Sequence, residues 1–331
     1  MTATVIAGTG SYVPERVMTN ADLERIVETS DEWITARTGI SERHIASDTQ
    51  ATSDLALEAA KKALENAGVA PEDVELVLVA TGTPDMAFPA TACLVQSRLG
   101  ATNAAAFDLS AACSGFIYGL SVADGFIRSN TYKTVLLIGA ETMSRVVDWK
   151  DRTTCVLFGD GAGAVVLQAG DDDPAAGGRG LVQTDIHSDG SAWDYICVPG
   201  GGSRLPPGHD MVDDGSQFLR MRGNETFKVA VRNMEAAARK VLDAAGVKVD
   251  DLKLAVPHQA NARILGAIAD RLGLKDEQLF MNLNKYGNTS AASIPLALDE
   301  AAKAGRMVSG DLVLMLAFGS GLTWGASLMR W

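Results

Sequence analysis

Cysteine is scarce in this chain of 331 residues. Its four cysteines form no CxxC pair and no metal-ligand spacing, so the sequence indicates no zinc-binding ribbon. So few cysteines in a chain of this size are typical of a reducing compartment. We therefore expect a cytoplasmic protein that holds neither a metal nor another cofactor.

Positive charge and long hydrophobic runs are also lacking. Lys and Arg number 29 against 41 Asp and Glu, and the net charge of −12 argues against a nucleic-acid partner. Strand-like residues 4–7 stand where a basic leader would lie, so we expect no secretory signal. Gly and Ser at positions 319–321 and 325–327 divide the most apolar stretch, 312–329, so we expect no membrane span.

What the chain does have is small and hydrophobic side chains. Hydrophobic residues make up 47% of the sequence and glycine contributes 33 residues, which is typical of a closely packed α/β protein. The apolar pattern predicts strands at 74–81 and 134–139 and a long helix from about 224 to 245. The glycine run at 159–163 lacks the Lys-Ser or Lys-Thr pair of a phosphate loop, so we interpret it as a hairpin or bulge.

The second part of the chain repeats the first. Residues 64–69 match 242–247, and residues 135–138 match 313–316, both at an offset of 178. Residues 110–113 match 290–293 at an offset of 180. Three matches in the same order predict a duplicated α/β unit whose sheets are covered by helices, with halves at 1–172 and 173–331.

The stretch 104–116 has the pattern of a reactive cysteine. Apolar residues 104–109 predict a strand, small residues follow, and Phe116, Leu120 and Ile127 mark one face of a helix. Cys113 then lies at a helix N-terminus, where the dipole lowers the pKa of a thiol below about 8.5. The alternative is a buried structural cysteine, which is the commoner fate of a Cys among small residues.

Two polar residues of the second half occupy related places. His258 follows the strand predicted at 252–256, and Asn288 precedes the helix predicted from about 289 to 304. Strand ends and helix starts of two related sheets can converge on one point, and catalytic groups gather at such points. Cys113, His258 and Asn288 are therefore predicted to be neighbours.

Three motifs resemble the signatures of the 3-oxoacyl-[acyl-carrier-protein] synthase III family. They are Ala112-Cys113-Ser114-Gly115-Phe116, the run from His258 to Ile264, and the run from Gly287 to Ser293. The resemblance implies a homodimer with a thiolase-like fold, in which the duplicated unit forms five αβαβα layers. It also implies the decarboxylating condensation of an acyl-CoA primer, often acetyl-CoA, with malonyl-acyl carrier protein, which releases CO2 and CoA and begins type II fatty acid synthesis.

That reaction needs these residue types. A thiolate attacks the primer thioester and holds the acyl group covalently, which divides one difficult step into two. Decarboxylation of the malonyl group then generates an enolate, which neutral N–H donors on His258 and Asn288 stabilise. For the oxyanion of acyl transfer, the resemblance implies the backbone N–H groups of Cys113 and Ser320.

The resemblance also assigns residues around the substrates. It places Trp33, Arg37 and Arg152 at the entrance for coenzyme A, Phe318 in the pocket, and Phe88 in the primer pocket of the neighbouring subunit. Two positions depart from the family pattern. Ser320 stands where many relatives have Gly, and Leu322 stands where some have Phe, so the preferred length of the primer stays open.

A basic surface is predicted on the long helix. Lys228 and Arg232 lie four residues apart and share a helix face, and the resemblance places Arg263 nearby. An acidic carrier protein can dock on so acidic a chain only where local positive charge offsets the repulsion. We predict that these three residues bind it; the alternative is an ordinary solvated face.

Other functions of the same fold stay open to different degrees. A biosynthetic thiolase needs a second cysteine near residues 318–321, which hold none, and an elongating synthase has a second histidine where this chain has Asn288. A secondary-metabolism enzyme with another primer or acceptor, and a silent paralogue that only binds carrier protein, remain alternatives. Cys93, Cys155 and Cys197 are assigned to packing.

Overall fold

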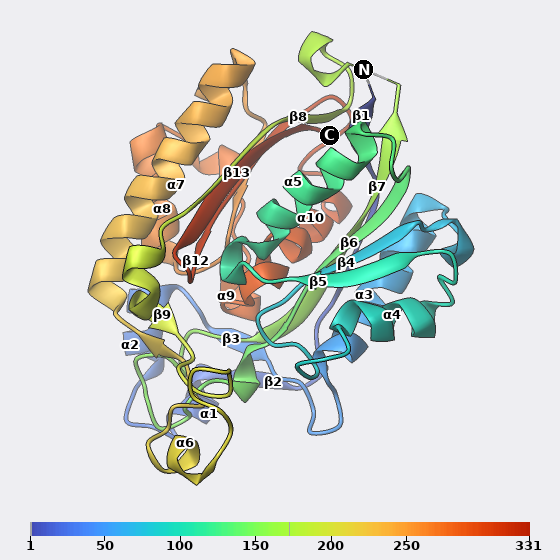
Figure 1. Cartoon of the computed structure of the whole chain (residues 1–331). Coiled ribbons are helices and arrows are strands. Elements are labelled where there is room, and N and C mark those ends of the chain that lie inside the picture. The colour runs from blue at the N-terminus through green and yellow to red at the C-terminus, as the bar shows by residue number, and fades with distance from the viewer. Residues whose placement is uncertain (1, 172) are drawn as a thin grey trace.

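Two β-sheets form the framework of the molecule in the computed structural model, which describes residues 2–171 and 173–331 (Figure 1). The first sheet has the strand order β1-β7-β6-β4-β5 and the second has the order β11-β12-β13-β8. Strand β4 runs parallel to both neighbours, and β11 runs parallel to β12. The strands are β1 (Ala3–Tyr12), β4 (Leu76–Ala80), β5 (Ala105–Leu109), β6 (Thr134–Thr142), β7 (Asp160–Gly170), β8 (Gly180–Ser188), β11 (Leu254–Pro257), β12 (Leu312–Gly319) and β13 (Thr323–Arg330).

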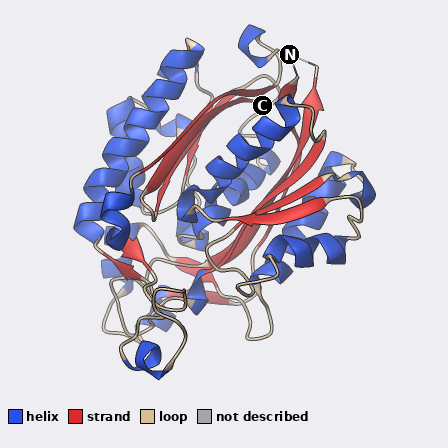
Figure 2. Ribbon diagram, viewed as in Figure 1, coloured by secondary structure: helices blue, strands red, loops and turns tan. Residues whose placement is uncertain are grey.

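Helices cover both sheets and also fill the space between them (Figure 2). One outer layer packs on the first sheet, a central pair lies between the sheets, and the other outer layer packs on the second sheet. The predicted five-layer αβαβα fold is therefore confirmed. In the same order, the helices are α3 (Thr52–Ala67) and α4 (Thr91–Leu99), α5 (Gly115–Arg128) and α10 (Ser293–Lys303), and α7 (Gly223–Ala245) and α8 (Ala262–Leu272).

The layers follow from where the apolar residues stand. Every residue of β6 and of β12 is buried, because helices cover both faces of each sheet. Helix α7 instead buries a single stripe that includes Ala230, Met234 and Val241, as an outer helix does. The predicted face of α5, through Phe116, Leu120 and Ile127, is fully buried between the two sheets.

The duplication is visible in the order of the elements. Helices α3 and α7 both end at a glycine in the left-handed region, Gly68 and Gly246, and these lie 178 residues apart (246 minus 68). A 3-10 turn and a parallel strand follow each of them. Two further 3-10 turns, η2 (Ala112–Ser114) and η8 (Ser290–Ala292), also start 178 residues apart (290 minus 112). The offset of 180 predicted for this segment is wrong by two residues, and Ala112 corresponds to Ser290.

The glycine run at 159–163 is not a hairpin or bulge, so that prediction was wrong. Strand β7 runs straight through residues 160–170 and pairs with both β1 and β6. The glycines make room for helix α10, since a Cβ atom on Gly163 would lie 2.4 Å from the backbone nitrogen of Leu296. A close helix-to-sheet contact, rather than a turn, requires small residues here.

Short elements gather at the end of the molecule where the cavity described below opens. The segment 199–215 contains one short helix and is otherwise irregular. No helix within the described residues is long and apolar enough to cross a membrane. The short elements are β2 (Val17–Thr19), α1 (Asn20–Leu23), α2 (Asp31–Thr38), β3 (Glu42–His44), β9 (Ile196–Cys197), α6 (His209–Asp213), β10 (Arg220–Met221) and α9 (Leu283–Tyr286).

Candidate active site

A cavity of about 830 Å³ collects most of the residues that the sequence singles out. Cys113 comes from the turn after β5, His258 follows β11, and Asn288 precedes α10. The predicted convergence of these three side chains on one cavity is therefore present, although 145 and 30 residues separate them along the chain. Other predicted residues in the cavity wall are Trp33, Arg37, Arg152, Lys228, Arg263, Phe318 and Ser320.

Cys113 occupies the tight turn η2 directly before helix α5, as predicted. The turn is possible because Ala112 adopts the left-handed region, with φ of 45°. The end of β12 lies against it, since a Cβ atom on Gly319 would be 2.7 Å from the Cys113 backbone nitrogen. Any side chain at position 319 would therefore displace the turn that carries the thiol.

The expected lowering of the thiol pKa is not found. Desolvation raises the pKa of Cys113 to about 12, and the nearby Glu141 charge adds to this, while a hydrogen bond from Ser290 opposes it. The side chain is only half-buried because it faces the cavity, yet the surrounding protein removes most of its hydration. At neutral pH the resting residue is therefore a thiol.

His258 is a buried, neutral imidazole. Burial lowers its pKa to about 3. Its Nδ1 lies 2.6 Å from the hydroxyl of Ser293, which also accepts the backbone N–H of Gln259 at 3.3 Å. Among the described residues, Nδ1 is the acceptor within reach of the Ser293 hydroxyl proton, so the hydroxyl donates to Nδ1 and the imidazole proton resides on Nε2. Sequence reasoning missed Ser293, which holds this tautomer.

Asn288 is held by both its backbone and its side chain. Its backbone N–H donates to the Leu157 carbonyl at 2.8 Å, and its carbonyl accepts the Gly159 N–H at 3.1 Å. Its Oδ1 accepts the Ser290 backbone N–H at 2.9 Å. Because the amide oxygen is engaged there, the Nδ2 group is the end that can donate into the cavity.

A buried carboxyl group also faces the cavity, and the sequence analysis overlooked it. Glu141 is fully buried at the end of β6, where its carboxylate accepts hydrogen bonds from Gly82, Thr83 and Ser290. Desolvation raises the pKa of Glu141, and these hydrogen bonds partly offset the effect. An acidic residue at the end of an otherwise apolar strand was the signal that could have revealed it.

The two departures from the family pattern have different surroundings. Ser320 lies in the cavity wall, and its hydroxyl donates to the carbonyl of Ile196, so the side chain is anchored to β9. Leu322 is buried among apolar residues of the α7 layer and is not part of the cavity wall. The substitution at 322 therefore does not change the cavity lining directly.

Aromatic and basic side chains meet at one part of the cavity wall. The guanidinium groups of Arg37 and Arg152 lie 4.7 Å and 5.3 Å from the centre of the Trp33 ring. Both arginines are exposed, while Trp33 is half-buried beneath them. A flat aromatic surface between two cations suits a ligand that carries both a planar ring and phosphate groups.

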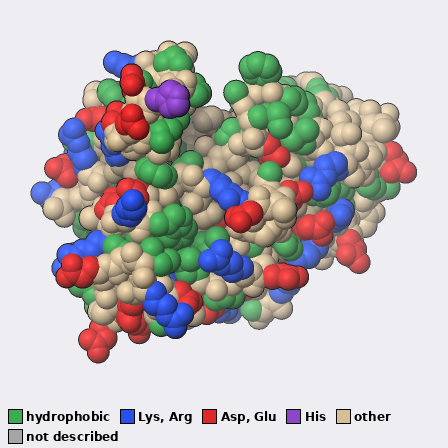
Figure 3. All heavy atoms as spheres, turned by 90° about the horizontal axis from the view of Figure 1, so that it is seen from below, with side chains coloured by type: hydrophobic (Ala, Val, Ile, Leu, Met, Phe, Trp, Pro, Cys, Tyr) green, Lys and Arg blue, Asp and Glu red, His purple; other side chains and the backbone are tan. Residues whose placement is uncertain are grey.

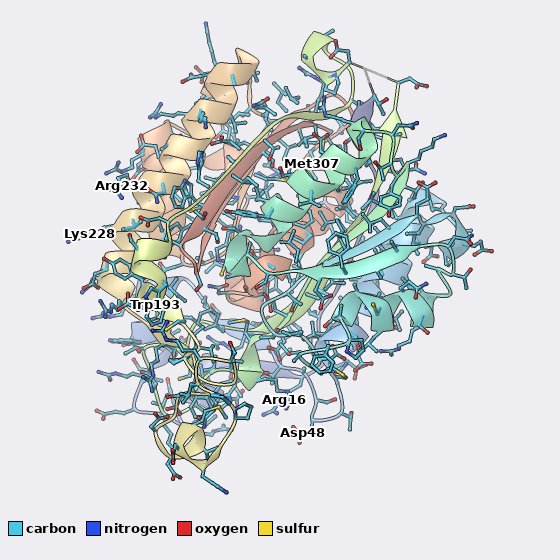
Figure 4. The ribbon with its side chains drawn as sticks, in the orientation of Figure 1. Arg16, Asp48, Trp193, Lys228, Arg232 and Met307 are labelled. Carbon is cyan, nitrogen blue, oxygen red and sulfur yellow. The ribbon has the colours of Figure 1, made fainter. Side chains whose placement is uncertain are left out.

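The three basic residues predicted to bind a carrier protein are exposed. Lys228 and Arg232 project from the same side of α7 (Figure 4), and Arg263 lies 5.7 Å from the Phe227 ring beside the cavity. Lys228 and Arg263 belong to the cavity wall, whereas Arg232 and Phe88 do not. Elsewhere the charges are mixed, and the face seen from below carries both signs interspersed (Figure 3).

The remaining cysteines are free thiols in different environments. Cys155 is fully buried, as expected of a packing residue, and burial raises its pKa to about 11. Cys197 instead lies in the cavity wall, which its assignment to packing did not anticipate. Within residues 2–171 and 173–331, no group of three or more His, Cys, Asp or Glu side chains is arranged to hold a metal ion.

Comparisons with known proteins show the family of the chain. Residues 107–190 match the family described as 3-oxoacyl-[acyl-carrier-protein] synthase III, and residues 242–331 match its C-terminal part. The beta-ketoacyl-[acyl-carrier-protein] synthase III of Caldanaerobacter subterraneus is 52% identical over 98% of this chain and 97% of that protein. The solved structure of 3-oxoacyl-[acyl-carrier-protein] synthase III from Aquifex aeolicus is 51% identical, with a TM-score of 0.91, and the match covers 99% of this chain and 100% of that one.

A more distant structure shares the architecture. The priming beta-ketosynthase of the R1128 polyketide pathway is 36% identical, with a TM-score of 0.91, over 99% of this chain and 96% of that one. The five layers and the cysteine-centred cavity define a thiolase-like condensing enzyme of the acyltransferase class. The chain belongs to the 3-oxoacyl-[acyl-carrier-protein] synthase III family, as the identities above 50% over nearly its full length show.

Proposed function

We infer that this chain condenses an acyl-CoA primer with malonyl-acyl carrier protein, with loss of CO2 and CoA, and so initiates type II fatty acid synthesis. One observation carries the assignment of its residues: Cys113, His258 and Asn288, from three distant segments, face the same cavity. Their chemistry divides the reaction between a nucleophile and two N–H donors. The experiment that tests it offers labelled acetyl-CoA and malonyl-acyl carrier protein and follows 3-oxoacyl product together with CO2.

In the first half-reaction, Cys113 attacks the carbonyl carbon of the primer and coenzyme A leaves. The developing oxyanion would lie beside the backbone N–H groups of Cys113 and Ser320, and a backbone donor survives the change from Gly to Ser. The Ser320 side chain is directed to Ile196, which keeps it from filling the space beside the thiol. Phe318, only 5% exposed, forms part of the apolar wall that the acyl group would contact.

In the second half-reaction, the malonyl carboxylate leaves as CO2 and the electron pair moves to the thioester oxygen. The Nε2–H of His258 and the Nδ2–H of Asn288 stabilise that enolate, and its carbon then attacks the acyl group on Cys113. A neutral imidazole suits this role because it donates a hydrogen bond without transferring a proton to the carbanion. Its low pKa keeps His258 in that state.

The entrance and the outer surface accommodate the two carriers. The guanidinium groups of Arg37 and Arg152 lie over the Trp33 ring, and these three side chains would hold the coenzyme A nucleotide. Lys228, Arg232 and Arg263 are exposed, and the first two project from the same side of α7 (Figure 4). They would attract an acidic carrier protein to the mouth of the cavity.

We also propose a homodimer that completes the primer pocket. Strand β5 is an edge strand with exposed residues, including Phe107, and an edge of this kind is a surface on which a second copy can add its own strand. Phe88 is 85% exposed, although a large aromatic side chain is normally covered. A partner subunit would cover Phe88 and receive it in its pocket.

The remaining assignments concern the chain as a whole. We propose the division into related halves, 1–172 and 173–331, although residue 172 itself lies outside the described residues. A cytoplasmic location fits the substrates. A role in secondary metabolism is less favoured, because the polyketide priming enzyme is 36% identical whereas fatty acid relatives exceed 50%. A panel of acyl-CoA primers of rising length decides it: preference for a long or unusual primer would favour the alternative.

A further inference from the structure

Glu141 is a buried acidic group in the cavity of Cys113 that neither half-reaction uses. It is 0% exposed, it lines the same cavity as Cys113, and its charge acts on the Cys113 thiol. A buried carboxyl group costs free energy unless its environment compensates it, so its hydrogen-bond partners show what it is suited to do.

Most partners of Glu141 donate hydrogen bonds to its carboxylate. The Gly82 backbone N–H lies 3.1 Å from both oxygens. The Thr83 hydroxyl donates to Oε2 at 2.6 Å, since an ionised carboxylate can only accept, and it accepts the Thr142 N–H at 2.9 Å. The Thr81 hydroxyl, 3.3 Å away, is fixed similarly by the Thr83 N–H. This set of donors holds an ionised carboxylate in place.

Ser290 is different because its hydroxyl has two partners. It lies 2.9 Å from Glu141 Oε1, and it lines the same cavity as Cys113, on the turn η8 that packs against the turn η2 of Cys113. Its hydrogen bond acts to lower the pKa of the Cys113 thiol. A hydroxyl carries one proton, so beside a neutral thiol it accepts from the S–H group and donates to the carboxylate. Ser290 keeps this position with φ of 49°, a strained value for a residue other than glycine.

We propose that Ser290 and Glu141 form a proton relay that deprotonates Cys113 as it attacks the primer thioester. The inference rests on the proposed role of Cys113 as acyl acceptor. The thiol proton passes to the Ser290 oxygen while the Ser290 proton passes to Glu141, and the sulfur electron pair forms the bond to the carbonyl carbon. When the tetrahedral intermediate collapses, the carbon–sulfur bond to coenzyme A breaks, and the proton returns through Ser290 to the departing thiolate.

The surroundings of His258, the other candidate base, favour proton transfer through Ser290 to Glu141. His258 carries its proton on Nε2, and its Nδ1 accepts from Ser293, so it has no free lone pair directed at the cavity. Burial raises the pKa of Glu141, which makes its carboxylate a stronger base than an exposed one. Ser290 is also the member of the set whose hydroxyl can turn between carboxylate and sulfur.

A purely electrostatic role for Glu141 makes the opposite prediction. Its negative charge opposes formation of a second negative charge on Cys113, so removing the charge alone would favour the thiolate. Glu141→Gln therefore separates the two accounts by the sign of its effect. If Glu141 only repels the thiolate, the variant acylates faster; if Glu141 accepts the proton, the variant acylates more slowly.

The test measures single-turnover self-acylation by labelled acetyl-CoA, after peptide mapping has located the label in the unmodified enzyme. Glu141→Gln and Ser290→Ala should each acylate about 10²-fold more slowly, the usual contribution of general-base catalysis, with an unchanged half-saturating acetyl-CoA concentration. CO2 release from malonyl-acyl carrier protein without primer reports on folding, because Ser290→Ala keeps the backbone N–H that orients Asn288. Both variants should retain that activity within about threefold, and Glu141→Asp should recover part of the acylation rate.

Each result decides the question. Unchanged or faster acylation in Glu141→Gln overturns the relay, and so does an equal loss of acylation and decarboxylation in both variants, which would indicate a structural role. Label on a cysteine other than Cys113 in the unmodified enzyme overturns the proposed nucleophile itself. Slower acylation with intact decarboxylation in both variants supports the relay.

Discussion

Ser290 stands in the second half of the chain where Ala112 stands in the first. Both residues adopt the left-handed region, with φ of 49° and 45°, and each opens a 3-10 turn directly before a central helix. In the first half the next residue is Cys113, whereas in the second half it is Ala291. One copy of the duplicated turn thus carries the thiol, and the other carries the hydroxyl that contacts it.

Each of the two turns packs on a strand of the other half. Turn η8 of the second half packs on β6 of the first sheet, and η2 of the first half packs on β12 of the second. Glycines permit both approaches: a Cβ on Gly139 would lie 2.2 Å from the Ala291 carbonyl oxygen, and one on Gly319 would lie 2.7 Å from the Cys113 nitrogen. Close packing of two related halves therefore positions the Cys113 thiol and its neighbours.

A glycine-to-alanine pair tests how tightly helix and sheet are packed. In Gly163→Ala, the new methyl group would lie 2.4 Å from the Leu296 nitrogen, so α10 must move, and we expect a loss of about 1–3 kcal/mol or more in the free energy of unfolding. Gly125→Ala in helix α5 is the control, since a Cβ atom on Gly125 would meet no atom within 4 Å outside its own stretch of helix. The free energy of unfolding of Gly125→Ala should rise by up to about 1 kcal/mol, because alanine favours the helix more than glycine does. Equal denaturation midpoints for the two variants would contradict the packing argument.

Features repeated along the chain were the most predictable from the sequence. The duplication, the long helix α7 and the strand-turn-helix around Cys113 depend on local patterns of apolar and small residues, and the structure confirms them. The register of Cys113 against the second half was misjudged by two residues, because SAAC and SAAS resemble each other in letters but differ in backbone conformation.

Properties that depend on surroundings could not be read from the sequence. The helix N-terminus suggested a low thiol pKa, yet burial outweighs it and raises the pKa of Cys113. The glycines at 159–163 suggested a turn because the helix that packs on them, α10, lies more than 130 residues further on. Ser293 and Glu141 likewise acquire their roles only from distant partners.

Acylation should be selective for Cys113 despite its raised pKa, because substrate binding rather than thiolate content directs the reaction. Incubation with a labelled acyl-CoA and peptide mapping should place the acyl group on Cys113, and Cys113→Ala should remove it. Cys197 is the informative comparison, since it lies in the same cavity wall. Label that persists in Cys113→Ala, or that moves with Cys197→Ala, would show the assignment to be wrong.

Arg263→Glu should weaken use of malonyl-acyl carrier protein and spare self-acylation by acetyl-CoA. Charges at the rim of an interface act on encounter, so the loss should shrink as ionic strength rises. Lys61→Glu makes the same change of charge on α3, in the opposite outer layer, and should leave both reactions intact. If Arg263→Glu impairs self-acylation equally, the residue serves the cavity rather than the docking surface.

The rate of malonyl decarboxylation should not fall through protonation of His258 when the pH is lowered from 7.5 to 5. An exposed imidazole would become charged near pH 6.5, but burial lowers the pKa of His258 to about 3, so the neutral Nε2–H donor persists throughout this range. CO2 release without primer, measured across the range with folding checked at each pH, tests this. A decline centred near pH 6.5 that disappears in His258→Gln would contradict the buried neutral state.

The three principal residues should divide the reaction between them. Cys113→Ala should abolish condensation yet retain some decarboxylation, because the enolate donors remain. His258→Ala and Asn288→Ala should lose decarboxylation, since each removes one donor to the enolate oxygen. A single donor of this kind contributes roughly 2.7–4 kcal/mol, or about 10²–10³ in rate.

Primer-free CO2 release from malonyl-acyl carrier protein is the assay that separates these roles. The two donor variants need not have additive effects, because both groups bind one oxygen. Ser293→Ala offers a graded comparison: it leaves the imidazole in place but removes the hydroxyl that fixes its tautomer, so its loss should be smaller than that of His258→Ala. If Cys113→Ala stops CO2 release while His258→Ala and Asn288→Ala continue it, the donors and the nucleophile have been assigned the wrong way round.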